Sequence, residues 1–495
     1  MQLTARSPKI MVSADGTGIV SQGGGLLLAQ TLRATGLDRG LEAALERWRQ
    51  PRAVHSPGKI ITDLAVAVAL GGDCLADVAM LRAQPELFGP VASDPVVSRL
   101  VARLAADAPR ALKAIRAARA AARQRAWELA GDAAPGAGGG LVTVDIDATI
   151  VTSCSDKEQA MPTWKKTYGH HPLAVFADHG PEGSGEPLAV MLRAGNAGSN
   201  TAADHMQLLD EAIAALPPAL RRNLMVTCDG AGASHELVKK LDQLASRRGY
   251  QVIYSVGWAL TGREKAALAL VPETAWEAAI DARGEVRERR ADGACADPRC
   301  AHRACWIEEA HVTELTGLLR SGPGGDQLKA WPKTMRVFAR RERPHPGAQL
   351  TLFEAEDGWR YSLWAANRPV TTRGWLGQCA YIDAAHRVHA RVEDVIRTGK
   401  DTGLGHFPSH DYKVNQAWLD ASMTACILLA WLRLLALDGD LAKAEPKTLR
   451  YRVLHAAARL VRGGRRRWLK IAASWPWAEA ITAAWQRISA LPQAP

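Results

Sequence analysis

The chain has 495 residues, of which 47% are hydrophobic and 23% are charged. These proportions are typical of a globular protein and exclude a disordered or fibrous chain, while the length predicts three or four structural units instead of one core. The net charge of +11 favours a polyanionic partner, although many chains rich in Ala and Arg are basic without binding nucleic acid.

Residues 1–131 are predicted to form a helical N-terminal domain. They are rich in Ala, Leu and Arg, and their charges recur at helical spacing. Two roles stay open for this domain, DNA binding or capping of the core, because it has no clean helix-turn-helix signature. The Pro/Gly-rich residues 132–140 are predicted to be a linker.

Residues 141–258 alternate short apolar runs with amphipathic segments, which predicts an α/β unit with a mixed sheet. The expected order is three strands, a helix, a strand, a helix and a strand, at 141–152, 172–178, 187–193, 202–216, 223–229, 234–248 and 250–257. This is also the order of ribonuclease H-like folds, in which the first and fourth strands lie side by side and present their carboxylates together.

Residues 259–375 are predicted to be a β-rich insertion into this core. Short alternating runs at 334–343, 348–356 and 359–367 are typical of β-hairpins. Helical spacing returns in residues 376–445, which are predicted to be the second part of the core. The apolar stretch 425–437 contains Arg433 and is too short to span a bilayer, so we expect a buried core helix and no membrane association.

The basic charge is densest in the C-terminal region, residues 446–495. The basic residues there up to position 470 are Lys447, Arg450, Arg452, Arg459, Arg462, Arg465, Arg466, Arg467 and Lys470. Such a cluster predicts a surface that follows a phosphate backbone, with Arg465, Arg466 and Arg467 as its densest part. The alternative is a solvated helix face followed by a basic turn.

Asp147 is the first of three acidic residues that stand out. It lies in the run VTVDIDATIV, and Asp145 lies two residues before it, so both side chains point to one face of a strand. The flanking residues are strongly apolar, and a buried charge must be paired or bound to a metal. We therefore predict a functional role for this pair.

The same segment also fits the nucleophile loop of haloacid dehalogenase-like phosphatases, which has the form Asp-x-Asp-x-Thr. In that alternative, Asp145 would be the nucleophile and Asp147 the general acid. The template also needs an acidic pair at the end of a later strand. Asp229 is followed by Gly-Ala-Gly, with no second carboxylate nearby, so the phosphatase is the second choice.

Asp229 ends the apolar run LMVTCD and opens the turn GAGAS. Gly230 and Gly232 allow the backbone to turn sharply beside a charged ligand, and Ser234 is a suitable N-cap for the helix that follows. Sites gather at strand ends in α/β folds, so we predict a functional role for Asp229 as well.

Glu393 lies in a segment with helical spacing. His386, His389, Glu393, Arg397 and Lys400 recur every three or four residues, which predicts one helix face. A carboxylate flanked by groups that bind phosphate is a sensible active-site stripe, although an ordinary exposed face has the same pattern. The neighbouring Asp394 is predicted to point about 100° away.

Two further clusters offer positive charge or metal ligands. Lys165, Lys166, Tyr168, His170 and His171 follow Asp147 closely and are predicted to reach DNA, unless they form only a basic turn. Cys295, Cys300, His302 and Cys305 offer soft ligands, but their spacing is not a common zinc pattern, so no structural Zn²⁺ is expected.

Eight cysteines in so long a chain, with no secretory apolar segment at the start, lead us to expect a reducing cytoplasm.

Several motifs in chain order resemble bacterial insertion-sequence transposases of the DDE type, most closely the insertion sequence 1380 family. They are VDIDAT, YGHHPL, LRAGNAGSNTAADH, VTCDGAGAS, ARRERPHPGAQL and HARVEDVIRTGKDTGLGHFP followed by NQAWL. In related transposases the third carboxylate lies in a Tyr-x2-Arg-x3-Glu-x6-Lys helix. This chain keeps Glu393 and Lys400 but has His386 and His389 at the Tyr and Arg positions.

The resemblance implies that Asp147, Asp229 and Glu393 bind two Mg²⁺ or Mn²⁺ ions for phosphodiester cleavage and strand transfer. Lys400 would hold a phosphate, and Asp145 would either support Asp147 or itself be the first ligand. The partner would be double-stranded DNA, as terminal inverted repeats and as target, bound by a homodimer on paired ends in the bacterial cytoplasm. An inactive DNA-binding relative is the remaining alternative.

The resemblance also raises two finer expectations. Related enzymes with a β-rich insertion cut DNA through a hairpin intermediate, so that route is one option here. An aromatic residue of the insertion could stack on a flipped base. The candidates are Trp331, Trp359, Trp364 and Trp375, each of which is also a natural core residue.

Overall fold

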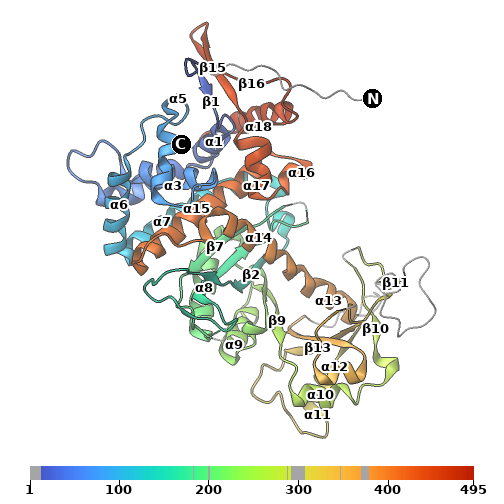
Figure 1. Cartoon of the computed structure of the whole chain (residues 1–495). Coiled ribbons are helices and arrows are strands. Elements are labelled where there is room, and N and C mark those ends of the chain that lie inside the picture. The colour runs from blue at the N-terminus through green and yellow to red at the C-terminus, as the bar shows by residue number, and fades with distance from the viewer. Residues whose placement is uncertain are drawn as a thin grey trace, which may run out of the picture.

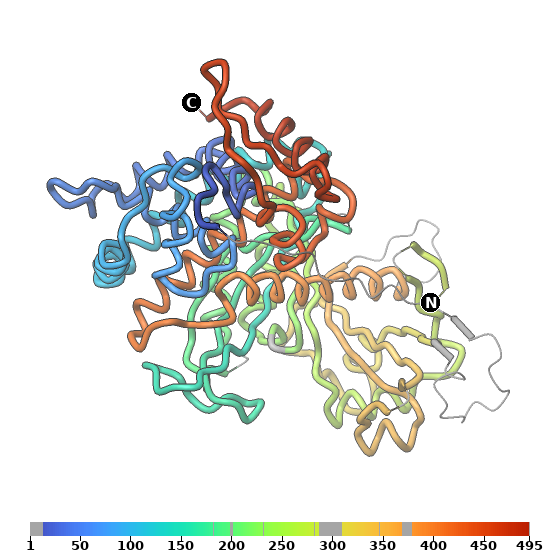
Figure 2. Tube along the Cα trace, turned by 45° about the horizontal axis from the view of Figure 1, so that its top comes forward, coloured from blue at the N-terminus to red at the C-terminus, as the bar shows by residue number. Residues whose placement is uncertain are grey.

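The computed structural model describes residues 13–494, except 182, 199–200, 282, 287, 291–306, 346 and 369–377. Figure 1 shows a helical part built from both ends of the chain, a central sheet below it, and a lobe at the lower right that holds the middle of the chain. Figure 2 shows the same three parts from a second direction.

The central sheet is mixed and follows the order β10-β12-β13-β14-β9-β8-β2-β6-β7, with β11 paired to β12. Its strands are β2 (Val142–Ala148), β6 (Leu173–Ala177), β7 (Glu186–Met191), β8 (Asn223–Cys228), β9 (Gln251–Trp258), β10 (Glu277–Ala278), β11 (Glu288–Arg290), β12 (Ile307–Glu314), β13 (Arg336–Glu342) and β14 (Arg360–Ala366). β2 pairs parallel with β8, which pairs parallel with β9, whereas β6 is antiparallel to β2 and β7. The first and fourth core strands are therefore neighbours, as predicted.

The elements predicted between residues 141 and 258 are present, with ends shifted by a few residues. The first apolar run is divided into β2 and β3 (Val151–Thr152), and β3 joins β4 (Met161–Pro162) and β5 (Tyr168–His170) in a small separate sheet. Two helices alternate with the later strands, α8 (Ala202–Ala215) and α9 (His235–Ala245). The Ser234 hydroxyl accepts the N–H of Leu237 and caps α9, as predicted.

The N-terminal helices pack onto the core. They are α1 (Gly25–Thr35), α2 (Leu37–Leu45), α3 (Pro57–Ala69), α4 (Ala79–Arg82), α5 (Pro85–Phe88), α6 (Asp94–Ala106) and α7 (Ala108–Ala130). Their buried apolar side chains and those of the sheet form one continuous cluster. Two buried ion pairs strengthen the contact, Arg119 with Asp420 at 2.8 Å and Arg123 with Glu186 at 3.0 Å. The arrangement is that of a cap on the core, and DNA binding by these helices stays a prediction.

The longest helix, α15 (Tyr412–Ala436), is the centre of the helical part (Figure 1). It begins well before the apolar stretch that we predicted as a core helix. Among the described helices it alone is long and apolar enough to cross a membrane, but 94% of its apolar window is buried inside the protein. Its contacts with α3, α6, α7 and β7 identify it as the core helix that the sequence predicts.

The residues between β9 and the helix α13 (Gln378–Arg387) extend the core sheet. β14 pairs antiparallel with β9, with Trp258 opposite Leu363 and Ser255 opposite Ala366. This lobe also holds α10 (Gly262–Leu268) and α11 (Thr316–Ser321). A small second core that includes Phe338, Trp364 and Ile382 lies between these strands and α13. The β-rich insertion is thus an outgrowth of the sheet edge.

One predicted strand of this lobe is wrong. Residues 352–357 form a helix, α12 (Leu352–Asp357), where the alternating run at 348–356 predicted a hairpin. The reason is a capping box, in which the Thr351 hydroxyl accepts the Glu354 N–H while the Glu354 carboxylate accepts the Thr351 N–H at 2.9 Å. The other two predicted runs are strands, β13 and β14.

α16 (Gly439–Ala442) lies at the end of the second part of the core. The C-terminal region, residues 446–495, begins with α17 (Pro446–Leu449) and a π-helical turn at Arg450–Leu454, and it ends with α18 (Ala478–Ala490). Between them, β15 (Ala458–Gly463) and β16 (Arg466–Ile471) form a hairpin that takes in β1 (Ile19–Val20) as a third strand. Gly464 and Arg465 make its two-residue turn, and both have positive φ. Lys447, Arg450 and Arg452 lie on helical turns, whereas the other six basic residues lie on the β-hairpin and its turn, so the helix face considered for this segment covers only its first part.

Candidate active site

Asp147 and Asp229 lie at the same edge of the sheet. Asp147 is near the end of β2, and Asp229 directly follows β8, where Ile146 pairs with Cys228 in parallel register. Because parallel neighbours end at the same edge, the residue after each of these partners faces the same region. The two carboxylates are thus brought together, as the sequence predicts.

Gly257 on β9 allows the turn after Asp229 to pack closely on the sheet. A Cβ atom at this position would lie 2.5 Å from the Gly230 nitrogen and 2.8 Å from the Asp229 carbonyl carbon. Both distances are shorter than atoms tolerate, so only glycine fits without displacing the backbone that carries Asp229. Sequence reasoning did not single out Gly257, because its role depends on a neighbouring strand.

Glu393 reaches the site from a helix. α13 continues through a 3₁₀ turn at Val388–Arg391 into α14 (Val392–Gly399), and Glu393 is exposed in the first turn of α14. Its charge acts on Asp147, so the third carboxylate lies near the first two. Asp394 points elsewhere and pairs with Arg397 at 3.1 Å, as predicted.

The three carboxylates repel one another electrostatically. Burial and then the negative charge of Asp229 raise the pKa of Asp147 to about 6, Glu393 adds to the effect, and His389 and the Ala148 N–H oppose it. Elevated carboxyl pKa values mark a cluster of negative charge that a cation would stabilise. Among the described residues, the one group of three metal-type ligands within 4.8 Å of each other is Asp73, Cys74 and Asp77, so the three catalytic candidates do not converge on one point.

Asp145, Thr227 and His389 form a hydrogen-bonded cluster behind Asp147. Asp145 is buried, and its carboxylate accepts the Thr227 hydroxyl. His389 Nδ1 lies 2.9 Å from Asp145 Oδ1 and 3.1 Å from Thr227 Oγ1. Burial lowers the pKa of His389, but Asp145, followed by Asp147 and Asp229, holds it above its ordinary value. Sequence reasoning missed Thr227, although it is the register partner of Asp145.

His386 is turned into the protein. Its Nδ1 lies 2.8 Å from the Ser255 hydroxyl, and its ring stacks on Trp364 with 5.2 Å between ring centroids. Burial lowers the pKa of His386 to about 3, which keeps the ring neutral. His386, His389 and Glu393 share the face that looks onto the sheet, because His386 bonds Ser255 on β9, His389 bonds Asp145 on β2 and the charge of Glu393 acts on Asp147. Within this face, His386 takes a supporting position between Ser255 and Trp364.

Two cations lie beside the carboxylates. Lys400 begins a π-helical turn, Lys400–Leu404, that follows α14. Burial lowers the pKa of Lys400, the charge of Lys165 lowers it further, and Asp147 raises it, so Lys165, Lys400 and Asp147 are electrostatic neighbours. Lys166 is exposed at the tip of the same hairpin as Lys165.

The remaining candidates are engaged by other parts of the protein. Arg397 pairs with Glu445 at 2.7 Å, so contact with DNA would require it to leave that partner. His170 and His171 are buried, and their rings bond the carbonyls of Glu158 and Ala197. The prediction that these two histidines reach DNA is therefore wrong.

The aromatic candidates of the insertion are mostly covered. Trp364 is buried, Trp331 stacks on His235 with 3.9 Å between centroids, and the guanidinium groups of Arg341 and Arg343 lie over Trp359. Trp375 and the Cys295, Cys300, His302 and Cys305 cluster lie outside the described residues.

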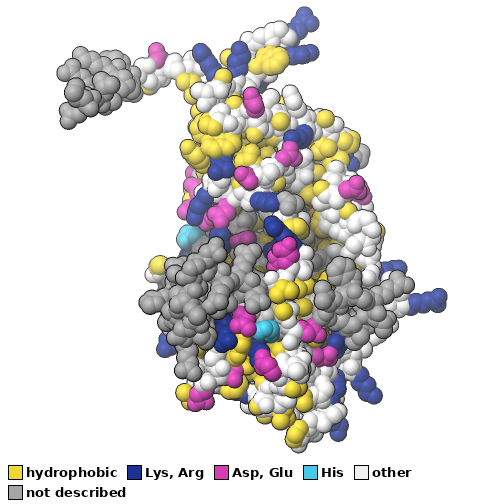
Figure 3. Space-filling model, turned by 90° about the vertical axis from the view of Figure 1, so that its right-hand side faces the viewer, with side chains coloured by type: hydrophobic (Ala, Val, Ile, Leu, Met, Phe, Trp, Pro, Cys, Tyr) yellow, Lys and Arg dark blue, Asp and Glu magenta, His cyan; other side chains and the backbone are white. Residues whose placement is uncertain are grey.

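The basic C-terminal hairpin projects from the far end of the helical part. Figure 3 shows Lys and Arg side chains gathered at that end of the molecule, where Figure 1 places β15 and β16. Arg465, Arg466 and Arg467 are exposed there. Arg467 pairs with Glu86 of the neighbouring helix α5 at 2.9 Å.

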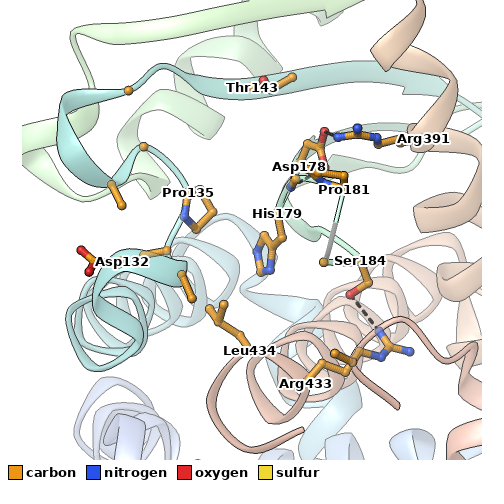
Figure 4. A pocket seen from close by; sticks show the side chains of 18 of the residues that line it. Asp132, Pro135, Thr143, Asp178, His179, Pro181, Ser184, Arg391, Arg433 and Leu434 are labelled. Carbon is orange, nitrogen blue, oxygen red and sulfur yellow. Dashed lines mark hydrogen bonds and ion pairs between the residues drawn. The ribbon is translucent and has the colours of Figure 1, made fainter. Parts of the chain in front are cut away.

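A cavity of about 720 Å³ lies at the opposite end of β2 from Asp147. Residues 132–140, the turn between β6 and β7, and the end of α15 line it (Figure 4). Two contacts cross its wall, Arg391 with Asp178 at 2.9 Å and Arg433 Nη1 with the Ser184 hydroxyl at 3.1 Å. None of the three catalytic candidates lines it, so the carboxylate site is at the sheet edge and not in this cavity.

A family model described as Transposase DDE domain group 1 matches residues 3–493 of the chain. The chain belongs to this family. It is a DDE transposase, an enzyme of phosphoryl transfer on DNA, and this excludes the phosphatase alternative. The buried Asp145, bonded to Thr227 and His389, is also poorly placed to be the exposed nucleophile of a phosphatase.

A cryo-electron-microscopy structure of the piggyBac transposase synaptic complex with hairpin DNA is similar, with 10% sequence identity and a TM-score of 0.36, over 88% of this chain and 80% of that chain. Among curated protein sequences, none matches the chain significantly. The family assignment rests on the family model alone.

Proposed function

We propose that this transposase excises and inserts a bacterial insertion sequence, and that Asp147, Asp229 and Glu393 are its catalytic carboxylates. The observation that carries the proposal is the placement of Asp147 and Asp229 at the ends of adjacent parallel strands, with Glu393 within electrostatic reach of Asp147. The strand order β7-β6-β2-β8-β9 supports a ribonuclease H-like core, with the β-rich insertion grown from its edge.

The residues at this site fit divalent metal ions. Carboxylate oxygens are the ligands that Mg²⁺ and Mn²⁺ prefer. Burial and then the negative charge of Asp229 raise the pKa of Asp147, and bound cations would offset both effects. Two ions would supply activation of the attacking oxygen and stabilisation of the leaving oxygen.

The other residues of the site position DNA and the carboxylates. Lys400 is placed to hold a phosphate beside Asp147, and Lys165 adds a second positive charge near it. Asp145, Thr227 and His389 tie the helix of Glu393 to the strand of Asp147. His386 supports this helix through Ser255 and Trp364, and Arg397 is held at the exposed face of α14 by Glu445.

We further propose binding of double-stranded DNA, both terminal inverted repeats and target, with the basic hairpin of Arg465, Arg466 and Arg467 as one contact surface. Concerted cutting of two ends calls for a homodimer on paired ends. The motifs quoted above support membership of the insertion sequence 1380 family and a bacterial cytoplasmic location, close to the nucleoid through DNA binding.

Cleavage of DNA that carries the repeats flanking the gene tests this proposal. Wild type should cut at the repeat ends with Mg²⁺ and stop when the ion is chelated. Glu393→Gln should bind the same DNA without cutting it. Asp394→Asn is the matched control, because its exposed side chain pairs with Arg397 and should be dispensable. Retained cutting by Glu393→Gln would remove Glu393 from the metal ligands.

A further inference from the structure

A short hairpin beside the catalytic carboxylates has a rigid tip. β4 and β5 are joined by the residues 163–167, where the Thr163 N–H donates to the Thr167 carbonyl at 2.7 Å and the Lys166 N–H to the Thr163 carbonyl at 3.0 Å. The two threonine hydroxyls also bond at 2.7 Å. Lys166 has a φ of 59°, as expected for the last residue of a three-residue hairpin turn.

This tip presents Trp164 to solvent. The side chain is 69% exposed, and Met161 and Tyr168 on the flanking strands are each 39% exposed. Of the tryptophans in the described part of the chain, Trp164 and Trp468 are the exposed ones. Lys165 Nζ lies 4.9 Å from the Trp164 ring centroid. An aromatic ring with adjacent lysines on a rigid turn has the chemistry of a surface that binds an unpaired nucleobase and its phosphates.

The hairpin is anchored next to Asp147. β5 runs through Pro172 into β6, where Ala174 is the antiparallel partner of Asp147, and the Pro172 carbonyl accepts the Thr149 N–H at 3.0 Å. At the tip, the charges of Lys165 and Asp147 both act on Lys400. A phosphate held by Lys400 would therefore have the hairpin tip as its neighbour.

A second contact holds the hairpin in place. Gly195 packs so closely beneath it that a Cβ atom there would lie 2.2 Å from the Gly169 carbonyl oxygen and 2.3 Å from the Met161 carbonyl oxygen. The base of the hairpin is thus fixed on the segment that precedes α8, while its tip projects into solvent. This combination of a fixed base and an exposed aromatic tip suits a residue that positions a flexible ligand.

We propose that Trp164 stacks on a base of the DNA immediately beside the scissile phosphate, while Lys165 and Lys166 contact the adjoining phosphates. The inference rests on the proposed function, because it assumes that this site cuts DNA. It assigns the stacking position to the catalytic core and not to Trp331, Trp359 or Trp364 of the insertion, which are covered.

Single-turnover cleavage at saturating DNA tests the proposal. Trp164→Ala should cut between about 5-fold and 150-fold more slowly, the range expected for loss of one base–aromatic stack, while the dissociation constant changes by less. Trp164→Phe should recover part of the rate. Leu352→Ala, which removes an apolar side chain that is 78% exposed on α12, is the control and should cut at the wild-type rate.

A photocrosslink separates contact from a structural effect. With 5-iodouracil placed within a few nucleotides of the cut, the wild-type protein should crosslink at Trp164. An unchanged rate in Trp164→Ala, or crosslinks that map only elsewhere, would overturn the proposal even if wild type cuts normally. If wild type shows no Mg²⁺-dependent cutting, the proposed function fails and this inference fails with it. Should Trp164→Ala not fold, the crosslink in the wild-type protein decides alone.

Discussion

His389 Nδ1 and Asp145 Oδ1 lie 2.9 Å apart, although 244 positions separate the two residues in the chain. The bond joins the helical segment that carries Glu393 to the strand that carries Asp147. The third carboxylate is thereby held near the first by a contact between two other residues. Thr227 completes the cluster from the strand that precedes Asp229.

This cluster predicts a loss of cleavage without a loss of DNA binding. Asp145→Asn and His389→Gln should each slow cutting by about 10-fold to 100-fold, as is usual for residues that orient metal ligands. In the double variant the losses should be less than additive, because both substitutions break the same bond. Additive effects in single-turnover cleavage would show that the two residues act separately.

The lowered pKa of His386 leads us to predict that the stability of the protein depends on pH. Its pKa is lowered to about 3 in the folded protein from an ordinary value of 6.5, so only the unfolded chain takes up a proton between these values. The free energy of unfolding should therefore fall as pH drops from 6.5 towards 3, by up to about 1.4 kcal/mol per pH unit from this group.

Urea unfolding of wild type and His386→Gln at several pH values between about 7.5 and 4.5, a window that spans the unfolded-state titration, measures this contribution. The difference between the two proteins isolates His386 from the carboxylates that titrate in the same range. The variant should lose less stability on acidification than wild type does. Parallel pH profiles would mean that His386 is protonated in the folded protein.

Substitution of Glu186, which lies far from the catalytic carboxylates, is predicted to lower the stability of the protein strongly. Its buried carboxylate accepts bonds from Arg123 at 3.0 Å, Trp127 at 2.6 Å and Trp431 at 2.9 Å, joining α7 and α15 to β7. Glu186→Gln should lower the free energy of unfolding by roughly 3–5 kcal/mol, because it leaves Arg123 as an uncompensated buried charge.

An exposed ion pair provides the control for this substitution. Arg397 and Glu445 are 55% and 51% exposed, so Glu445→Gln should cost no more than about 1 kcal/mol in the same urea titration. Similar losses in the two variants would contradict the account of how the N-terminal helices are attached to the core.

The basic hairpin predicts a salt-dependent loss of DNA affinity. Replacing Arg465, Arg466 and Arg467 by Ala should weaken binding and reduce the slope of log affinity against log salt by up to about 3, since each phosphate that an arginine neutralises adds about 0.9 to that slope. Glu86→Gln should not weaken binding, because it removes a negative charge beside Arg467. An unchanged salt slope in the triple variant would exclude this hairpin from the DNA-binding surface.

The sequence predicts the carboxylate edge because it depends on local patterns. Apolar runs place Asp147 and Asp229 at strand ends, and the strand order makes those strands neighbours. The contact of His389 with Asp145 is not predictable in this way, because it depends on how a helix lies across the sheet. The spacing of His386, His389 and Glu393 predicts their common face, but it does not predict the stacking of His386 on Trp364, because that contact depends on how the helix packs against the insertion.

At two other places where the structure differs from the prediction, the sequence contains a motif that indicates the observed structure. Thr351 and Glu354 have the spacing of a capping box, which specifies the helix α12 over an alternating strand. The Gly463-Gly464 pair within the basic C-terminal run indicates the tight turn of a hairpin. The pairing of β1 with β15 has no such signal, because it joins opposite ends of the chain.

The most direct measurement is Mg²⁺-dependent cleavage of DNA carrying the flanking repeats, by wild type and by Asp229→Asn. The account predicts that wild type cuts at the repeat ends and that the variant binds the same DNA without cutting it, because the amide cannot replace a charged metal ligand at the end of β8. Cutting by Asp229→Asn at the wild-type rate would contradict the assignment of the active site to this edge of the sheet.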